Sequence, residues 1–126
     1  MTMGTAPPAP KTFTSVGAIN QYRFVKFSAA NSVEECDSQG EAAMGVCVSD
    51  AADGEAVSVW MLSDGGIIPI EASASISVLD EITTGTAGKA EAAAASDIIL
   101  GVVVEAASGD LHVVGFVPEY AARAHA

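Results

Sequence analysis

The sequence predicts an all-β fold, a small pseudo-symmetric β-barrel or β-tulip, and three observations support it. Short apolar segments alternate with turn signals such as Asp53-Gly54 along most of the chain, a spacing typical of strands joined by tight turns. The segment at 22–28 is interpreted as a strand, with Tyr22, Phe24 and Lys26 pointing one way and Arg23, Val25 and Phe27 the other. A strand–turn–strand pattern occurs twice, at 44–61 and again at 100–117.

Three regions are expected along the chain. Residues 1–21 form an extended N-terminal arm, because the "APPAP" segment favours polyproline geometry and Pro lacks the donor that a sheet needs. Residues 22–118 form the β-barrel domain. Residues 119–126 form a C-terminal tail or a short helix, with Pro118 near the start of that helix.

The barrel domain is expected to contain several short strands. The segment at 56–62 has large apolar residues on both of its faces, which indicates a strand covered on both sides or lying at an interface. The Ala-rich segment at 89–97 is compatible with a helical turn, although it lacks an apolar stripe. The expected strands are 22–28, 44–49, 56–62, 67–71, 75–79, 98–105 and 111–117.

The repeated pattern consists of a Gly-Val strand, an acidic turn and a second apolar strand. Two copies are too few for a solenoid, which needs about three. We therefore expect two similar hairpins that close one pseudo-symmetric barrel. The residues matched between the copies are Gly45-Val46 with Gly101-Val102, Val48 with Val104, Gly54-Glu55 with Gly109-Asp110, and Val59 with Val114.

Composition excludes several classes of partner. Sixteen acidic residues against five Lys and Arg give a net charge of −11, which disfavours binding to nucleic acid or to an anionic membrane surface. No segment approaches the roughly 20 apolar residues of a membrane span, and the N-terminus does not read as a signal peptide. Half of the residues are apolar, mostly Ala and Val, so the core is thin and self-association would add burial.

Two segments imitate ligand sites and are better explained as turns. The segment "TTGTAGKA" at 83–90 lacks the first Gly of a phosphate loop and has Ala90 where that loop carries a magnesium-binding hydroxyl. The segment "DAADGE" at 50–55 lacks the ligand spacing and the terminal Glu of a calcium loop. A Gly-rich hairpin turn and a solvated hairpin turn are the favoured interpretations.

No catalytic residue, cofactor or metal site is predicted. Carboxylates surround Cys36, but one Cys with carboxylates is a poor zinc set. Cys36 and Cys47 are expected to be free thiols in a reducing cytoplasm, with Cys47 buried. The two histidines, His112 and His125, lack a nucleophile partner nearby. Trp60 is expected in the core or at a subunit contact.

The repeat and its flanking turns resemble a family of small phage capsid decoration (cement) proteins, of the lambda-head-decoration-like type. The resemblance covers residues 40–117, and one departure is notable: where that family has a Gly-Asp turn, this chain has Ser77-Val78-Leu79-Asp80. The matching residues are Gly45, Val46, Gly54, Glu55, Val57, Val59, Pro69, Val78, Gly88, Lys89, Gly101, Val102, Gly109 and Asp110.

The resemblance implies a viral structural protein rather than an enzyme. It implies a homotrimer, made in the host cytoplasm, that binds the outer surface of an icosahedral phage capsid and clamps neighbouring major capsid protein subunits. The segment from Thr12 to Tyr22 is the expected capsid-binding arm, where Lys11 or Arg23 would meet acidic capsid groups; the alternative is a leader followed by an ordinary strand. The expected capsid contacts are Thr12, Phe13, Val16, Ile19, Tyr22 and Arg23, and the expected subunit contacts are Trp60 and Met61.

Three alternatives stay open at this point. The chain could be another virion component, such as a tail, vertex or head-fibre protein, present in few copies per particle. It could be a ligand-binding β-module, although no aromatic platform is visible among seven aromatic residues. An enzyme would need a site built on His112 or on a metal.

Overall fold

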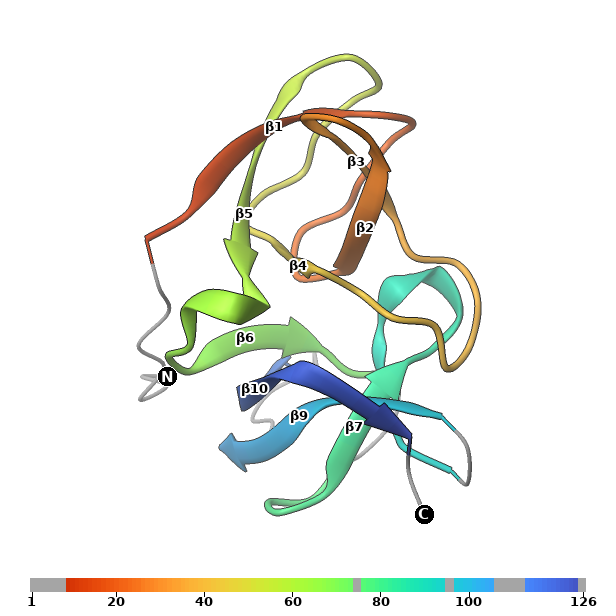
Figure 1. The fold of residues 1–126 in the computed structure, drawn as a ribbon, viewed down its shortest axis with the longest axis vertical. Helices are drawn as coiled ribbons and strands as arrows, with labels where there is room; N and C mark the ends of the chain where they lie inside the picture. Colours follow the sequence, from red (N-terminus) through yellow and green to blue (C-terminus); the bar gives the residue numbers. More distant parts are fainter. Residues whose placement is uncertain (1–8, 74–75, 95–96, 106–112, 125–126) are drawn as a thin grey trace.

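The fold consists of a closed five-stranded barrel beside a second five-stranded sheet (Figure 1). The computed structural model describes residues 9–73, 76–94, 97–105 and 113–124. Residues 119–124 are described by their backbone alone. The predicted all-β class with a closed barrel is confirmed. No helix among the described residues is long and apolar enough to cross a membrane.

The barrel is built from the N-terminal half of the chain. Its strand order is β1-β3-β2-β4-β5. β1 closes the barrel, because it pairs antiparallel with β5 and parallel with β3. The sequence predicts an extended arm at these residues, whereas the structure has a strand there. The bounds are β1 (Lys11–Ser15), β2 (Phe24–Ala29), β3 (Ser32–Glu35), β4 (Gly45–Cys47) and β5 (Ala56–Met61).

The second sheet has the strand order β6-β10-β9-β7-β8. Two short 3-10 turns accompany it, η1 (Leu62–Asp64) after β5 and η2 (Thr86–Gly88) between β7 and β8. The strand bounds are β6 (Ile68–Glu71), β7 (Glu81–Thr84), β8 (Ala90–Ala92), β9 (Ile98–Glu105) and β10 (Val113–Ala124).

Three local predictions fail because pairing with neighbouring strands decides the backbone. The expected strand at 75–79 is wrong: its described residues lie in a turn, and the strand starts at Glu81. The Ala-rich segment forms β8 instead of a helical turn, because it pairs with β7. In place of a C-terminal helix the backbone continues as β10, where Arg123 still pairs with Ile99 of β9.

The repeated pattern forms two hairpins, as expected, but they lie in different sheets. The first copy is the β4–β5 hairpin of the barrel, and the second is the β9–β10 pair of the second sheet (Figure 1). The expectation that both copies close one barrel is therefore wrong. Register also corrects one match: Val59 pairs with Cys47, and its counterpart opposite Val103 is Phe116 rather than Val114.

Apolar side chains form two clusters, and β5 contributes to both. Val57 and Val59 face the barrel interior, while Trp60 belongs to the cluster between the barrel and the second sheet, as does Leu62 of η1 just after the strand. The prediction that this strand is covered on both sides is confirmed. The remaining buried members of the barrel cluster are Ile19, Val25, Val33, Cys47 and Ala51.

Candidate interaction surface

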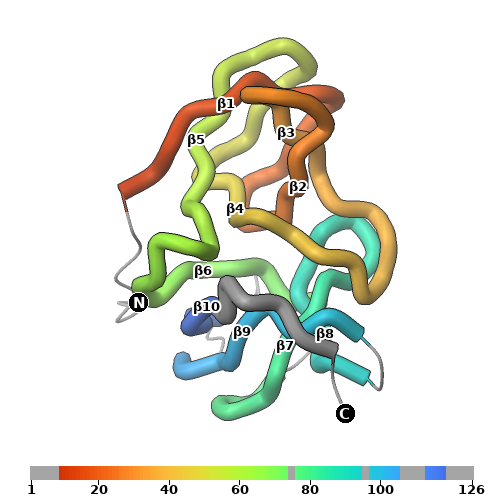
Figure 2. The backbone as a smooth tube through the Cα atoms, viewed as in Figure 1, coloured from red at the N-terminus to blue at the C-terminus, as the bar shows by residue number. Residues whose placement is uncertain are grey.

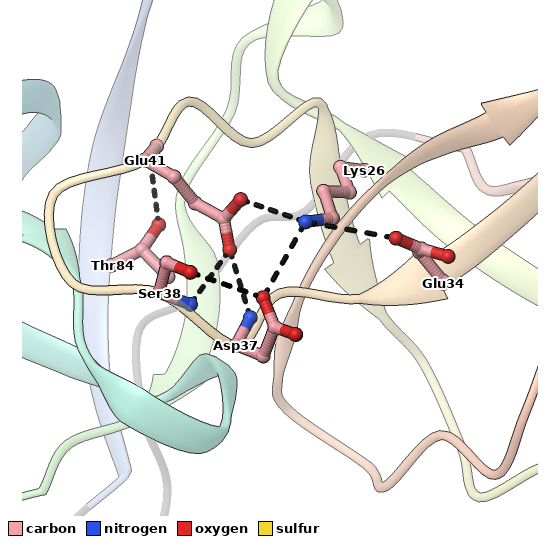
Figure 3. A network of polar contacts seen from close by, with 6 residues as sticks. All are labelled: Lys26, Glu34, Asp37, Ser38, Glu41 and Thr84. Atoms are coloured by element: carbon pink, nitrogen blue, oxygen red, sulfur yellow. Dashed lines mark hydrogen bonds and ion pairs between the residues drawn. The ribbon is translucent and has the colours of Figure 1, made fainter.

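A charged network around Lys26 holds the segment between β3 and β4 (Figure 3). The Lys26 ammonium lies 2.8 Å from a Glu41 carboxylate oxygen, 3.5 Å from Asp37 and 3.6 Å from Glu34. The other Glu41 oxygen accepts hydrogen bonds from the backbone N–H groups of Asp37 and Ser38, at 2.8 and 2.9 Å. Glu41 thus satisfies a cation and two loop amides at once.

The same segment connects the barrel to the second sheet. The Thr84 hydroxyl of β7 donates to the Glu41 carbonyl at 3.0 Å. The Gly40 N–H donates to the Thr84 carbonyl at 2.7 Å, and the Ile98 N–H donates to the Gly40 carbonyl at 3.3 Å. Figure 2 shows this segment passing beside the turn between β7 and β8. We call residues 36–44 the connecting loop.

Ionisation favours the network at neutral pH. Burial alone would raise the pKa of the Glu41 carboxyl, but hydrogen bonds from Lys26, Ser38 and Asp37 outweigh burial and lower this pKa. The hydrogen bond to Glu41 and the nearby carboxylates raise the pKa of Lys26 above its ordinary value. Both groups are therefore charged over the physiological range.

Arg23 makes a second connection between barrel and sheet. Its guanidinium lies 3.9 Å from Glu35 in β3 and 3.8 Å from Glu71 in β6, and it donates to the Ala87 carbonyl at 3.0 Å. Lys89 also meets Glu71, at 3.1 Å. The Arg23 side chain, expected to face a capsid, is therefore occupied within the molecule.

β1 and the residue after it expose part of the segment expected to bind a partner. Phe13 packs edge-to-face on Phe27 with 5.5 Å between ring centroids. Phe27 is 52% exposed and Phe13 is half-buried; we call these two rings the barrel patch. Thr12 is exposed beside Phe13, and Val16 is exposed just beyond β1.

The remaining predicted contact residues lie inward. Ile19 is buried and exchanges two backbone hydrogen bonds with Ala51, both 2.9 Å. Tyr22 stacks on Trp60 with centroids 6.3 Å apart. Trp60 is 9% exposed and belongs to the core, and Met61 is half-buried. The structure thus separates the predicted set into Thr12 and Val16, which are exposed, and the other members, which are buried or half-buried.

A second apolar surface, missed from the sequence, lies on the second sheet. Val103 of β9 points into the core, so Val104 points outward. Glu81 pairs with Val102, and the Leu79 N–H donates to the carbonyl of Val103, so the turn before β7 lies beside the end of β9 that carries Val104. The exposed side chains Val78, Leu79, Val104 and Val117 form what we call the sheet patch. The only sequence signal was the departure from the Gly-Asp turn.

The two cysteines are buried and free, as predicted for Cys47. Burial raises the pKa of the Cys36 thiol to about 12 and that of the Cys47 thiol to about 11. Within the described part of the chain, no three His, Cys, Asp or Glu residues gather closely enough to hold a metal ion. His112 and His125 lie outside the described residues.

The two segments that resemble ligand-binding motifs are turns, as predicted. Residues 83–90 span the end of β7, η2 and the start of β8. In the turn at 50–55, the carboxylates accept backbone hydrogen bonds: Asp50 from Gln21 at 2.7 Å, and Glu55 from Ala52 at 2.7 Å. These carboxylates act as caps for loop backbone.

Comparisons with known proteins agree with this architecture. Residues 9–117 match the family described as phage cement protein. The fold is similar to the crystal structure of the head fiber gp8.5 N base in bacteriophage phi29, with a TM-score of 0.72. That alignment covers 87% of this chain and 92% of the other at 23% identity, so it speaks for the fold alone. No curated protein gives a significant match.

Proposed function

The chain belongs to the phage cement protein family, and from that premise we propose that it clamps neighbouring major capsid protein subunits on the outer surface of an icosahedral head. Membership in the family makes it a structural virion protein that binds, decorates and stabilises a phage capsid. The observation that carries the proposal is the family match over 9–117, which includes the whole barrel and most of the second sheet.

The barrel patch is the proposed capsid contact. Apolar aromatic side chains that are fixed but exposed contribute strongly to protein interfaces, and Phe13 holds the Phe27 ring in place. Thr12 and Val16 flank this contact along the chain. Ile19, Tyr22 and Arg23 support it from inside, because their contacts fix the path of the chain after β1.

The charge of the chain fits a position on the outside of a filled head. A net charge of −11 gives no attraction to packaged DNA or to an anionic membrane. In this proposal the protein is made in the host cytoplasm and docks as a homotrimer. Three linked contacts bind far more tightly than one, because each attached copy raises the local concentration of the next.

The test of the function is the copy number of the chain relative to the major capsid protein in purified virions. Quantitative mass spectrometry should give a ratio near one to one or another large fixed fraction. The likeness to a head fiber base supports a second candidate, a fibre, tail or vertex component, which predicts a handful of copies. Absence from the particle would contradict both and favour a ligand-binding module.

The test of the contact is Phe27→Ser, measured as affinity for heads prepared without the chain. We expect binding at least about tenfold weaker, the loss typical of an interface anchor. The fold should survive, because the ring is 52% exposed. Ser28→Ala, at the next and also exposed position, is the matched control and should bind normally. Equal binding by both variants would remove the barrel patch from the contact.

A further inference from the structure

The turn before β7 presents a large apolar side chain in a conformation that such residues avoid. Leu79 has φ of 78° and is 76% exposed. A left-handed backbone is strained for any residue with a Cβ, apart from Asn and Asp, which tolerate it better. Leu79 therefore combines backbone strain with an exposed hydrophobic surface, and neither feature helps the fold.

The turn is held in place from both sides. The Ser77 N–H donates to the Asp80 carboxylate at 3.0 Å, and the Asp80 N–H donates to the Ser77 carbonyl at 3.1 Å. The Leu79 N–H donates to the Val103 carbonyl at 2.7 Å, and the Val103 N–H donates to the Asp80 carbonyl at 3.0 Å. Leu79 is thus presented by a fixed turn, which limits the entropy lost when it is covered.

Leu79 lies beside other exposed apolar residues. Its N–H bonds to the carbonyl of Val103, the neighbour of Val104, and Val102 of β9 pairs directly with Val117 of β10. Val78, Val117 and Val104 are 46%, 42% and 36% exposed. Figure 1 places the turn before β7 at the end of the molecule away from the barrel. The sheet patch and the barrel patch are therefore separate surfaces.

The charges around the sheet patch indicate what covers it. Asp80 follows Leu79 directly, and the whole chain carries a net charge of −11. A second copy of this acidic chain would bring like charges together around the contact, which is unfavourable. Four side chains also bury far less than the roughly 1,200 Å² of a stable pairwise interface. A partner that is already tethered elsewhere, apolar at its centre and basic at its rim, meets both conditions.

We propose that the sheet patch, centred on Leu79, is a second capsid-binding surface that docks on an apolar, basic-rimmed site of a major capsid subunit. This inference rests on the proposed function, and it gives the clamp its second contact. One subunit would bind the barrel patch and the neighbouring subunit the sheet patch. Each contact is small, and their linkage through one rigid protein supplies the affinity.

The experiment compares Leu79→Asn with Leu79→Met in binding to heads prepared without the chain. Asn tolerates the left-handed backbone but removes the apolar side chain; Met keeps an apolar side chain of similar volume. We expect binding at least about tenfold weaker for L79N, within about threefold of wild type for L79M, and weakened by added salt for wild type. The urea midpoint of L79N should equal or exceed that of wild type.

The outcomes separate this inference from the proposed function. Normal binding by L79N, with Phe27→Ser still defective, would overturn the second surface and leave the proposed function intact. A smaller molar mass of L79N by light scattering, with normal binding per protomer, would assign the patch to a second copy and also overturn it. Failure of the wild-type chain to bind heads would overturn the proposed function itself.

Discussion

At the scale of single residues, Gly45 and Gly101 explain why the Gly-Val pattern occurs twice. A Cβ on Gly45 would lie 2.5 Å from the carbonyl oxygen of Trp60. A Cβ on Gly101 would meet the carbonyl oxygen of Val117 just as closely. In each hairpin the partner backbone crosses directly over the glycine, so no larger residue fits. The shared pattern therefore records a packing requirement of the hairpin, which does not depend on the sheet that contains it.

Replacing either glycine should destabilise the protein by a similar amount. Gly45→Ala and Gly101→Ala are each expected to lower the free energy of unfolding by about 2 kcal/mol or more, because the added methyl group must displace backbone. Urea denaturation followed by tryptophan fluorescence measures this. Gly54→Asn is the control: a Cβ there meets nothing within 4 Å. An unchanged midpoint for both Ala variants would contradict the close approach.

The two cysteines give a second prediction at this scale. Both thiols are buried and their pKa values are raised, so very little reactive thiolate exists at neutral pH. Iodoacetamide at pH 7.5 should leave Cys36 and Cys47 unmodified in the native protein and modify both in urea. Mass spectrometry of the intact chain counts the additions. Rapid modification of the native protein would show that the cluster around the modified cysteine opens readily.

At the scale of elements, the apolar pattern of the sequence correctly predicted those strands in which the strand's own residues determine which face is buried. The bounds of β9 match the expected strand at 98–105, and those of β5 differ by one residue. No strand was expected at β1, and β10 extends past the expected end at 117, because partner strands distant in the sequence determine both. Lys11–Ser15 is extended because β5 and β3 lie on either side. Pro118 sits in a strand because β9 continues beside it.

The connecting loop provides a prediction about pH. The folded pKa of Glu41 lies below its ordinary value of 4.5, so its stabilising contribution is complete above that value and is lost as pH falls through the folded pKa. Glu41→Gln should cost about 1.5–3 kcal/mol at pH 7, as for a hydrogen bond to a charged group. The cost should shrink as the pH falls through the lowered folded pKa of Glu41, where wild type also loses the charge.

Urea denaturation at a series of pH values from 7 downward checks this expectation. Glu34→Gln is the matched control: Glu34 meets the same Lys26 ammonium, but at 3.6 Å and with a more exposed side chain. Exposed ion pairs contribute about 0–1 kcal/mol, so this variant should change stability little. Equal effects of the two substitutions would mean that the loop amides of Asp37 and Ser38 do not depend on the Glu41 carboxylate.

At the scale of the whole molecule, the candidate surfaces were only partly readable from the sequence. Phe13 was predicted as a contact, and it is half-buried at the surface. Its partner Phe27 was not predicted, since the alternation of side chains along a strand does not show which of them stay exposed to solvent. Leu79 was visible as a departure from a turn pattern, but its left-handed backbone and its position beside Val103 depend on the contacts of this turn with β9.

Two separate patches lead to a prediction for the assembled particle. Adding wild-type protein to heads that lack it should raise the temperature at which they release DNA. Phe27→Ser and L79N should each lose part of that gain, and the double variant should lose nearly all of it, because a clamp needs both ends. Differential scanning fluorimetry with a DNA dye measures the release. Full protection by the double variant would rule out both patches as the source of stabilisation.

The strand order of the second sheet also affects how the protein folds during its synthesis on the ribosome. The barrel uses only residues 11–61, so it is able to close while later residues are still being synthesised. β6 has β10 as its single partner strand among the described residues, and β10 follows it by more than forty positions. Until β10 emerges, Ile68 and Ile70 lack the strand beside which they are buried. The nascent chain therefore passes through a stage in which the strands of the barrel are all present while the second sheet still lacks a strand.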